Sequence, residues 1–279
     1  MRMAVNKFSR ERDDEGLAVG SLPPPLMMRH APEQVAVTRN RILMGLSPGD
    51  RARLLGVLQP VTFAVGDVVC ESGVRMEHIF FPTSAVVSSL YTMEDGATVE
   101  MGLAGNDGVI GVSLFLGGDS TPHQDVVVVP GGALAMKAKT LQEEFARGGA
   151  LQGLLLRYTQ ALITQISQAA VCNRLHAAEQ RLCRWLLMCH DRVDTDDLQM
   201  TQEFISSMLG GRRETVTVAA KRLQDAGFIR YTRGHITILD RKGLEGTVCE
   251  CYSTVGLPKD RVPTTQVLRR RVVKAALLG

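Results

Sequence analysis

The sequence lacks any long apolar run, and its first residues are polar. The polar N-terminus, which contains Arg2, Lys7, Arg10 and Arg12, lacks the apolar core of a secretory signal peptide. No other stretch is apolar enough over a sufficient length to cross a bilayer. Six cysteines in 279 residues are too few for the disulfide framework of small secreted domains. We therefore expect a cytoplasmic chain that has no membrane partner.

Signatures of catalysis and of metal binding are also missing. We find no P-loop, no zinc signature and no nucleophile paired with a base, and a lone serine or histidine indicates no reaction. Cys249 and Cys251 form a C-x-C pair that has no second pair at ligand spacing, so we interpret them as reduced thiols. His176 and His190 are interpreted as helix-surface residues. The sequence predicts no enzyme, no metal site and no cofactor.

The composition is that of a globular protein large enough for two domains. Hydrophobic residues make up 45% and charged residues 22% of the chain, and the formal net charge is only +3. Residues 200–246 carry eight lysine and arginine residues against five acidic ones. A local excess of positive charge, on one segment of a nearly neutral chain, favours contact with an anion such as DNA.

Residues 200–240 have the order of parts of a DNA-binding unit. Thr201 is a suitable N-cap for a helix with one apolar face, and Gly210 and Gly211 end that helix. A second helix fits residues 212–226, and residues 228–239 alternate like a β-hairpin. A helix, a tight turn, a second helix and a β-hairpin together predict a winged helix-turn-helix.

The second helix presents a short polar face near its N-terminus. We expect Arg213, Glu214 and Thr217 to contact base edges, because arginine pairs with guanine and glutamate accepts from the cytosine amino group. Residues suited to contact phosphates surround this face. They are Thr201, Arg212, Lys221 and Arg233.

The whole stretch resembles the DNA-binding domain of the Crp/Fnr transcription regulators. Residues 213–216 read Arg-Glu-Thr-Val, a frequent opening of that family's recognition helix, whereas Val218 stands where the family often has a further arginine. The resemblance covers roughly residues 40–252. It implies an α+β protein whose antiparallel β-barrel or jelly-roll sensor domain, similar to cyclic-nucleotide-binding domains, is joined by a long dimerisation helix to a winged helix-turn-helix.

The rest of the chain divides in a way that fits this resemblance. Short β-rich segments from Val61 to Met136 are cut by Gly, Pro or Asp, as in a small antiparallel barrel. We expect five parts, listed in chain order. They are a disordered tail (1–39), a β-roll sensor domain (40–140), a dimerisation helix (141–173), the winged helix-turn-helix (174–247) and a basic tail (248–279).

A stripe of side chains at alternating four- and three-residue spacing runs along the expected dimerisation helix. It includes Leu151, Leu155, Tyr158, Leu162 and Ala169. Such a stripe is typical of a coiled coil, and in the resembled family this helix pairs with its two-fold mate. The same pattern also fits a helix that packs on its own barrel.

The expected sensor pocket lacks the charge that a cyclic nucleotide needs. No arginine occurs between Arg75 and Arg147, so the phosphate clamp of the resembled family is missing. Asn106-Asp107-Gly108 stands in place of the ribose-binding Gly-Glu, and Asp125 would repel an anion. We expect a degenerate pocket and name no effector.

These observations predict a homodimeric regulator that reads a palindromic operator on double-stranded DNA. RNA polymerase is a further candidate partner. The rival prediction is a small-molecule-binding signalling module whose C-terminal helices contact protein instead of DNA. Salt separates the two predictions, because phosphate contacts make DNA affinity fall steeply with ionic strength.

Overall fold

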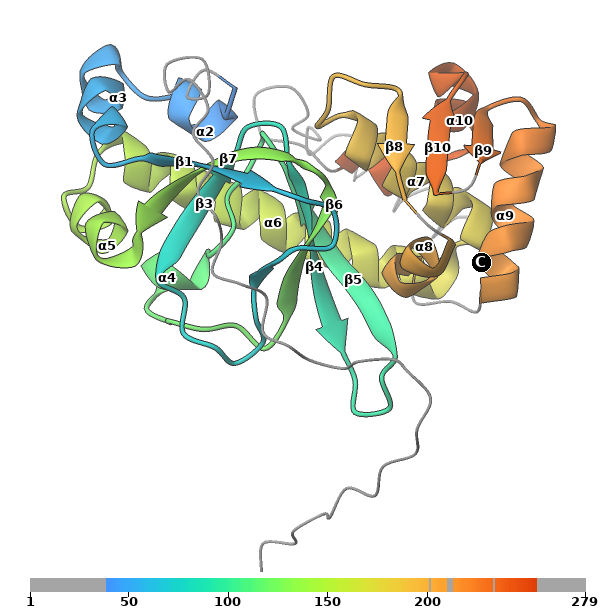
Figure 1. Cartoon of the computed structure of the whole chain (residues 1–279), viewed down its shortest axis with the longest axis horizontal. Coiled ribbons are helices and arrows are strands. Elements are labelled where there is room, and N and C mark those ends of the chain that lie inside the picture. Colours follow the sequence, from blue (N-terminus) through green and yellow to red (C-terminus); the bar gives the residue numbers. More distant parts are fainter. Residues whose placement is uncertain (1–38, 201, 210–212, 233, 255–279) are drawn as a thin grey trace, which may run out of the picture.

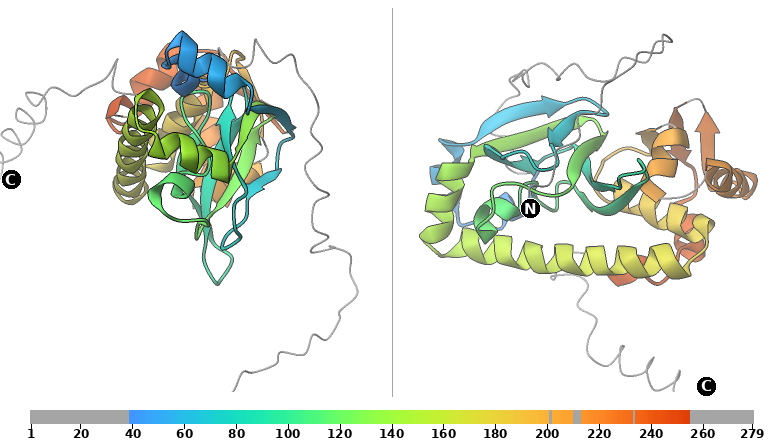
Figure 2. Two further views of the ribbon diagram at one scale, coloured as in Figure 1. Left: turned by 90° about the vertical axis from the view of Figure 1, so that its left-hand side faces the viewer. Right: turned by 90° about the horizontal axis from the view of Figure 1, so that it is seen from below.

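The computed structural model describes residues 39–200, 202–209, 213–232 and 234–254. They form an N-terminal β-roll, a long helix that runs beneath it, and a C-terminal group of helices and short strands (Figures 1 and 2). Most of both expected tails, 1–39 and 248–279, lies outside the described residues. Within the described residues, no helix has the length and apolar character to cross a membrane.

Two antiparallel sheets build the β-roll, as the sequence predicted. One has the order β1 (Gln59–Phe63), β7 (Gly131–Lys137), β3 (His78–Pro82). The other has the order β2 (Val68–Cys70), β6 (Gln124–Val129), β4 (Val86–Thr92), β5 (Thr98–Ala104). Gly96 takes a φ of 83° in the hairpin between β4 and β5, a conformation that glycine adopts without steric cost.

Short helices close the ends of the β-roll. They are α2 (Arg41–Met44), α3 (Pro48–Leu55), α4 (Ser113–Leu116) and α5 (Ala138–Ala146). The start of α3 follows from its sequence: Pro48 opens the helix, and the Ser47 hydroxyl accepts a hydrogen bond from the Asp50 amide at 3.1 Å.

The long helix α6 (Ala150–Leu175) starts later than the expected segment 141–173. Gly148 and Gly149 have φ values of 76° and 83°, which a right-handed helix does not continue, so the chain turns between α5 and α6. In Figure 2, α6 runs along the β-roll and reaches the C-terminal helices. One helix thus joins both parts of the molecule.

The expected pairing stripe of α6 faces its own chain. Leu151, Leu155 and Tyr158 are buried in the core of the β-roll, with Leu162 packed against it, and Ala169 is also buried. These side chains are covered within one chain because the β-roll presents an apolar surface along the helix. The exposed face of α6 is therefore a different one from the face that carries this stripe.

The C-terminal part has the expected winged helix-turn-helix. Its elements are α7 (Ala178–His190), β8 (Asp197–Gln199), α8 (Gln202–Leu209), α9 (Arg213–Asp225), β9 (Ile229–Thr232), β10 (His235–Ile238), α10 (Arg241–Thr247) and a 3-10 turn, η1 (Tyr252–Thr254). The hairpin β9–β10 is confirmed, and β8 adds a third strand on the other side of β10. Strand β8 was not predicted from the sequence.

One hydrophobic core is shared by the β-roll and the C-terminal part. Val86 of β4 and Leu103 of β5 belong to the same buried cluster as Trp185 of α7 and Met208 of α8. This cluster extends to Leu223 of α9 and to the strands of the wing. The helix-turn-helix is therefore packed against β4 and β5 as well as connected through α6.

Two buried polar contacts reinforce this packing. Glu100 of β5 accepts hydrogen bonds from the Trp185 indole at 2.6 Å and from the Ser88 hydroxyl at 2.8 Å. Asp107, in the loop after β5, binds the guanidinium of Arg192 just beyond α7 through both carboxylate oxygens, at 2.7 and 3.0 Å. A bidentate pair of this kind fixes orientation as well as distance.

Candidate nucleic-acid interface and sensor pocket

Helix α9 buries one side and exposes the other. Val216, Ala219, Ala220 and Leu223 are buried against the shared core. Several side chains point away from it. These are Glu214, Thr215, Thr217, Val218, Lys221 and Arg222. The structure thus places Glu214, Thr217 and Lys221, three of the residues expected to contact DNA, on one exposed face of the second helix.

The remaining predicted DNA contacts are only partly described. Arg213 is the first residue of α9, but its side chain lies outside the described part of the structure. Thr201, Arg212 and Arg233 lie outside the described residues altogether.

Two further residues modify the exposed face of α9. Val218 is 51% exposed, and an apolar side chain at this place suits contact with a thymine methyl group. Arg222 lies 3.6 Å from Glu179 at the start of α7, so part of its charge is offset within the protein. The face therefore combines one carboxylate, two hydroxyls, one apolar side chain and two basic side chains.

The wing follows α9 directly. Gly227 and Gly234 take φ values of 77° at the two turns, so the chain leaves α9 and then reverses between β9 and β10. The Arg230 side chain on β9 is exposed. His235, one of the basic residues near the tip, is held by Asp197 of β8, with 3.3 Å between Nδ1 and the carboxylate. The third strand thus steadies the hairpin.

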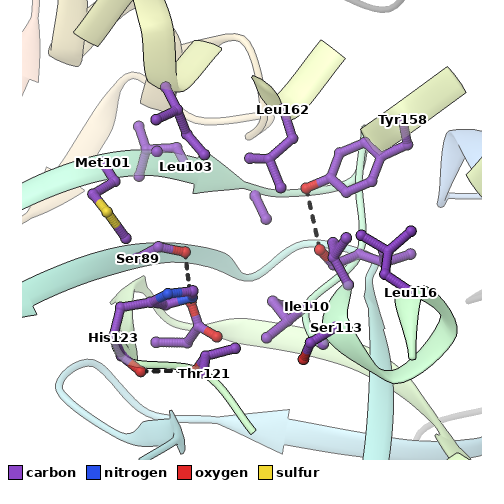
Figure 3. A pocket seen from close by; sticks show the side chains of 17 residues that line it. Ser89, Met101, Leu103, Ile110, Ser113, Leu116, Thr121, His123, Tyr158 and Leu162 are labelled. Atoms are coloured by element: carbon purple, nitrogen blue, oxygen red, sulfur yellow. Dashed lines mark hydrogen bonds and ion pairs between the residues drawn. The ribbon is translucent and has the colours of Figure 1, made fainter. Parts of the chain in front are cut away.

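A cavity of about 230 Å³ lies between the β-roll and α6. Figure 3 shows Tyr158 and Leu162 of α6 on one side, and Ser89 and His123 of the β-roll on the other. Apolar residues make up most of its wall, and none of its lining residues is a lysine or arginine. This cavity is smaller than the 300–1,000 Å³ or so that is usual for ligand pockets.

Three polar side chains of this cavity interact with one another. Asp125 accepts a hydrogen bond from the Ser89 hydroxyl at 2.5 Å and lies 3.7 Å from the His123 ring. Burial raises the pKa of the Asp125 carboxyl, and the charge of a protonated His123 opposes that rise. The cavity has no fixed positive charge to balance an incoming phosphate.

The segment Asn106-Asp107-Gly108 does not provide a ribose site in this conformation. The Asp107 carboxylate is bound to Arg192, as described above. Tyr158 lies against Gly108, where a side-chain Cβ would come within 2.4 Å of the phenol ring. Its hydroxyl donates to the Val109 carbonyl at 3.1 Å. An aromatic side chain thus fills space beside the loop where a sugar would be held.

Comparison with known proteins identifies the DNA-binding part and the fold. Residues 180–247 match the family model of the Crp-like helix-turn-helix domain. FixK2 from Bradyrhizobium japonicum is similar over 69% of this chain and 98% of its own, with a TM-score of 0.59 and 16% identity.

Two further solved structures are similar at comparable levels. A putative transcriptional regulator of the Crp/Fnr family from Eubacterium rectale matches with a TM-score of 0.59 and 15% identity, over 75% of this chain and 98% of its own. A CRP-family transcriptional regulator from Thermus thermophilus matches with a TM-score of 0.56 and 14% identity, over 67% and 95%. A search of curated protein sequences gave no match. The chain therefore has the fold of these Crp/Fnr-type structures, and its residues 180–247 form a Crp-like helix-turn-helix domain.

Proposed function

We propose that the chain is a homodimeric transcription regulator that reads a two-fold symmetric DNA operator. The observation that carries this proposal is the exposed face of α9, which lies in a Crp-like helix-turn-helix domain beside a three-stranded wing. Each recognition helix enters a major groove, with half-sites about one helical turn, or about 34 Å, apart. The function is regulation of transcription and involves no catalysis.

Base contacts are assigned to Arg213, Glu214 and Thr217. Glu214 and Thr217 are exposed near the start of α9, the part of a recognition helix that meets base edges. The phosphate contacts are assigned to Thr201, Arg212, Lys221 and Arg233, around this face. Among them Lys221 is exposed one turn further along α9.

The test is selection of bound sites from a pool of random duplex DNA, first without added ligand. We expect enrichment of a two-fold symmetric site. Arg213→Ala should weaken binding to that site by about 1–3 kcal/mol and relax the preference at one base pair of each half-site. Lys221→Ala is the matched control: it should weaken binding to every sequence about equally and reduce the dependence on salt. Unchanged affinity and preference in Arg213→Ala would refute the base assignment.

The partner surface on α6 is assigned to its open face. Leu156, Ile163 and Ile166 are 47%, 54% and 38% exposed and recur at spacings of seven and three residues. Ala170, which is also exposed, follows Ile166 at a spacing of four residues. This is heptad spacing, and a second copy of the same helix would cover it. We therefore propose a dimer through this face, while the stripe of α6 that includes Leu151, Leu155 and Tyr158 packs against the β-roll of its own chain.

The cavity under the β-roll is proposed to be a degenerate sensor pocket. The absence of lysine and arginine from its wall, the buried Asp125 and the position of Tyr158 all disfavour a cyclic nucleotide. We expect cyclic nucleotides at millimolar concentration to leave both the selected site and the affinity unchanged. A cyclic-nucleotide requirement for enrichment would contradict this part of the proposal.

A protein-binding C-terminal part would behave differently in the same assay. Contact with phosphates releases counterions, so the logarithm of the DNA affinity must fall steeply as salt rises. We expect that fall. Failure to retain any DNA at low salt, with and without small molecules, would favour the signalling-module alternative.

A further inference from the structure

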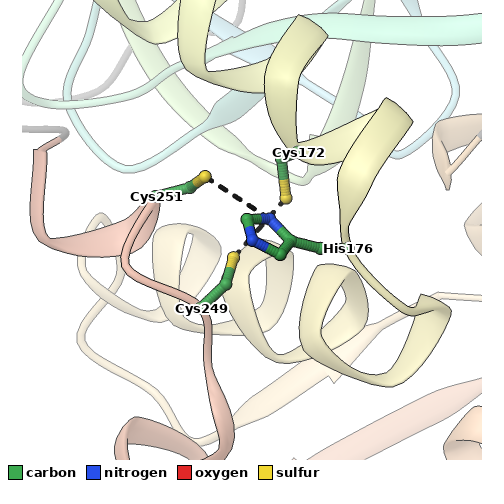
Figure 4. Close-up of side chains that lie close together, drawn as sticks. All are labelled: Cys172, His176, Cys249 and Cys251. Carbon is green, nitrogen blue, oxygen red and sulfur yellow. Dashed lines mark hydrogen bonds between the residues drawn. The ribbon is translucent and has the colours of Figure 1, made fainter. Parts of the chain in front are cut away.

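Four metal-ligating side chains converge where α6 ends. Cys172 and His176 come from the last turn of α6 and its C-cap, whereas Cys249 and Cys251 follow α10 (Figure 4). Their ligand atoms all lie within 4.8 Å of one another. The three cysteines form a buried cluster of their own, separate from both large hydrophobic cores. Parts of the chain about 75 residues apart therefore meet at one point.

The separations between donor atoms suit a single ion. The sulfurs of Cys172 and Cys249 are 3.6 Å apart, as are the Cys251 sulfur and Nδ1 of His176. With Zn–S of about 2.3 Å and Zn–N of about 2.0–2.1 Å, tetrahedral zinc spaces its donors about 3.5–3.8 Å apart. The two sulfurs are too distant for a disulfide, whose S–S bond is about 2.05 Å.

The surroundings of the cluster also suit a bound cation. Nε2 of His176, the ring nitrogen that faces away from Cys251, lies 3.5 Å from the Glu250 carboxylate. A carboxylate on the far nitrogen of a ligating histidine fixes its tautomer and orientation, and metal-binding histidines commonly have such a partner. Nδ1 is thereby left free to act as the ligand.

Positive charge nearby balances the charge of a cysteine-rich site. Zinc bound by three thiolates and a neutral imidazole carries one net negative charge. The Nε atoms of Arg181 and Arg184 are buried without a hydrogen-bond partner among the described residues. The charge of Arg184 also acts on the Cys172 thiol. A divalent cation would deprotonate such thiols outright.

The geometry points to a structural zinc site formed by Cys172, His176, Cys249 and Cys251. Cysteine and histidine ligands select Zn²⁺ over Mg²⁺ or Ca²⁺, which take oxygen ligands. Four protein ligands leave no open position for a water or substrate, so the site is closed and non-catalytic. Its effect is mechanical: the ion ties the segment after α10 to the end of α6, beside the turn into α7.

The segment after α10 is held by neighbouring contacts that do not need the ion. The Tyr252 hydroxyl, one residue beyond Cys251, donates to Asp191 at 2.9 Å and accepts from Arg241 at 2.9 Å. Arg241 also binds Asp191 at 2.6 Å. Loss of the ion should therefore loosen this segment without unfolding the whole chain, which allows ligand variants to be purified.

The first test is the metal content of the full chain, purified under reducing conditions without chelator. We expect one zinc per chain, and Co²⁺ exchanged into the site should give a tetrahedral cobalt–thiolate absorption spectrum. Cys249→Ala and Cys251→Ala should each lower the zinc content at least tenfold. Cys189→Ala, a fully buried cysteine of α7 outside the cluster, is the control and should keep one zinc.

A second variant pair tests the histidine. His176→Cys supplies a fourth thiolate and should retain the metal, whereas His176→Ala should bind it more weakly by at least tenfold. The proposal is overturned if the unsubstituted chain takes up no zinc after reconstitution, or if it binds iron and sulfide instead. A Cys172–Cys249 disulfide in protein isolated without oxygen would overturn it as well, as would full zinc content in the cysteine variants.

Discussion

At the scale of single residues, the contact between Glu100 and Trp185 has the clearest consequence. Glu100 is buried between the β-roll and α7, and Trp185 is the only tryptophan in the chain. Burial raises the pKa of Glu100 above its ordinary value of 4.5, although hydrogen bonds from Trp185 and Ser88 and the charges of Arg184 and Arg192 oppose the rise.

This raised pKa predicts a pH-dependent free energy of unfolding. The folded state binds the Glu100 proton more tightly than the unfolded state does. Protonation of Glu100 therefore stabilises the folded state fully below pH 4.5, and this stabilisation is lost as pH rises through the pKa of Glu100 in the folded state. Trp185 fluorescence and denaturant unfolding should both show this loss in the unsubstituted chain. Glu100→Gln should remove it, because an amide does not titrate. Identical pH profiles for both proteins would contradict the prediction.

The pair Asp107–Arg192 gives a second prediction at this scale. Its side chains are only 17% and 5% exposed, so Arg192→Ala leaves a buried carboxylate without its partner. We expect a loss of about 3–5 kcal/mol in the free energy of unfolding, measured with urea. Arg222→Ala breaks an exposed pair with Glu179 and should cost about 1 kcal/mol or less. Equal effects of the two substitutions would show that Asp107 is solvated without Arg192.

At the scale of elements, the proposed dimer through the open face of α6 can be tested by substitution. Ile163→Glu places a charge in the proposed helix–helix contact and should weaken the dimer at least tenfold, which corresponds to about 1.4 kcal/mol or more. Analytical ultracentrifugation measures the change. Arg157→Ala, on the same helix but at the far edge of the open face, should leave the dimer intact. A dimer unchanged by Ile163→Glu would move the interface elsewhere.

Helix α6 also shows where sequence patterns stop being informative. Leu151, Leu155, Tyr158 and Leu162 follow the spacing of a coiled coil, and so do Leu156, Ile163 and Ile166. Periodicity finds both stripes but does not say which one its own β-roll covers, since that depends on packing between distant elements. The two-helix unit, the β9–β10 hairpin and the Ser47 cap were predictable because their signals are local.

Other parts of the molecule had weak or distant signals. Strand β8 is three residues long, too short to show alternation. The cluster of Cys172, His176, Cys249 and Cys251 joins a C-x3-H spacing on α6 to a C-x-C pair that lies far along the chain. In the sequence only the C-x-C pair was recognisable, and a single such pair is consistent with two reduced thiols. Only the fold brings Cys172 and His176 beside it.

At the scale of the whole molecule, the shared core predicts cooperative unfolding. Side chains of β4, β5 and β6 pack in one buried cluster with those of α7, α8 and α9. We therefore expect a single calorimetric transition for the described fold. Its van't Hoff enthalpy should equal its calorimetric enthalpy when both are expressed per cooperative unit. Two separated transitions would mean that the β-roll and the helix-turn-helix are stable independently, contrary to this packing.

The same shared core bears on how freely this DNA-binding domain can be recombined. A chimera that joined the β-roll to another regulator's helix-turn-helix would set the apolar side chains of Val86, Leu90 and Leu103 against a surface that did not evolve with them. The reverse graft would expose the faces of α7 and α8 that now cover β4 and β5. Under the proposed function, specificity for a new operator is more readily changed by substitutions on the exposed face of α9 than by exchange of the domain.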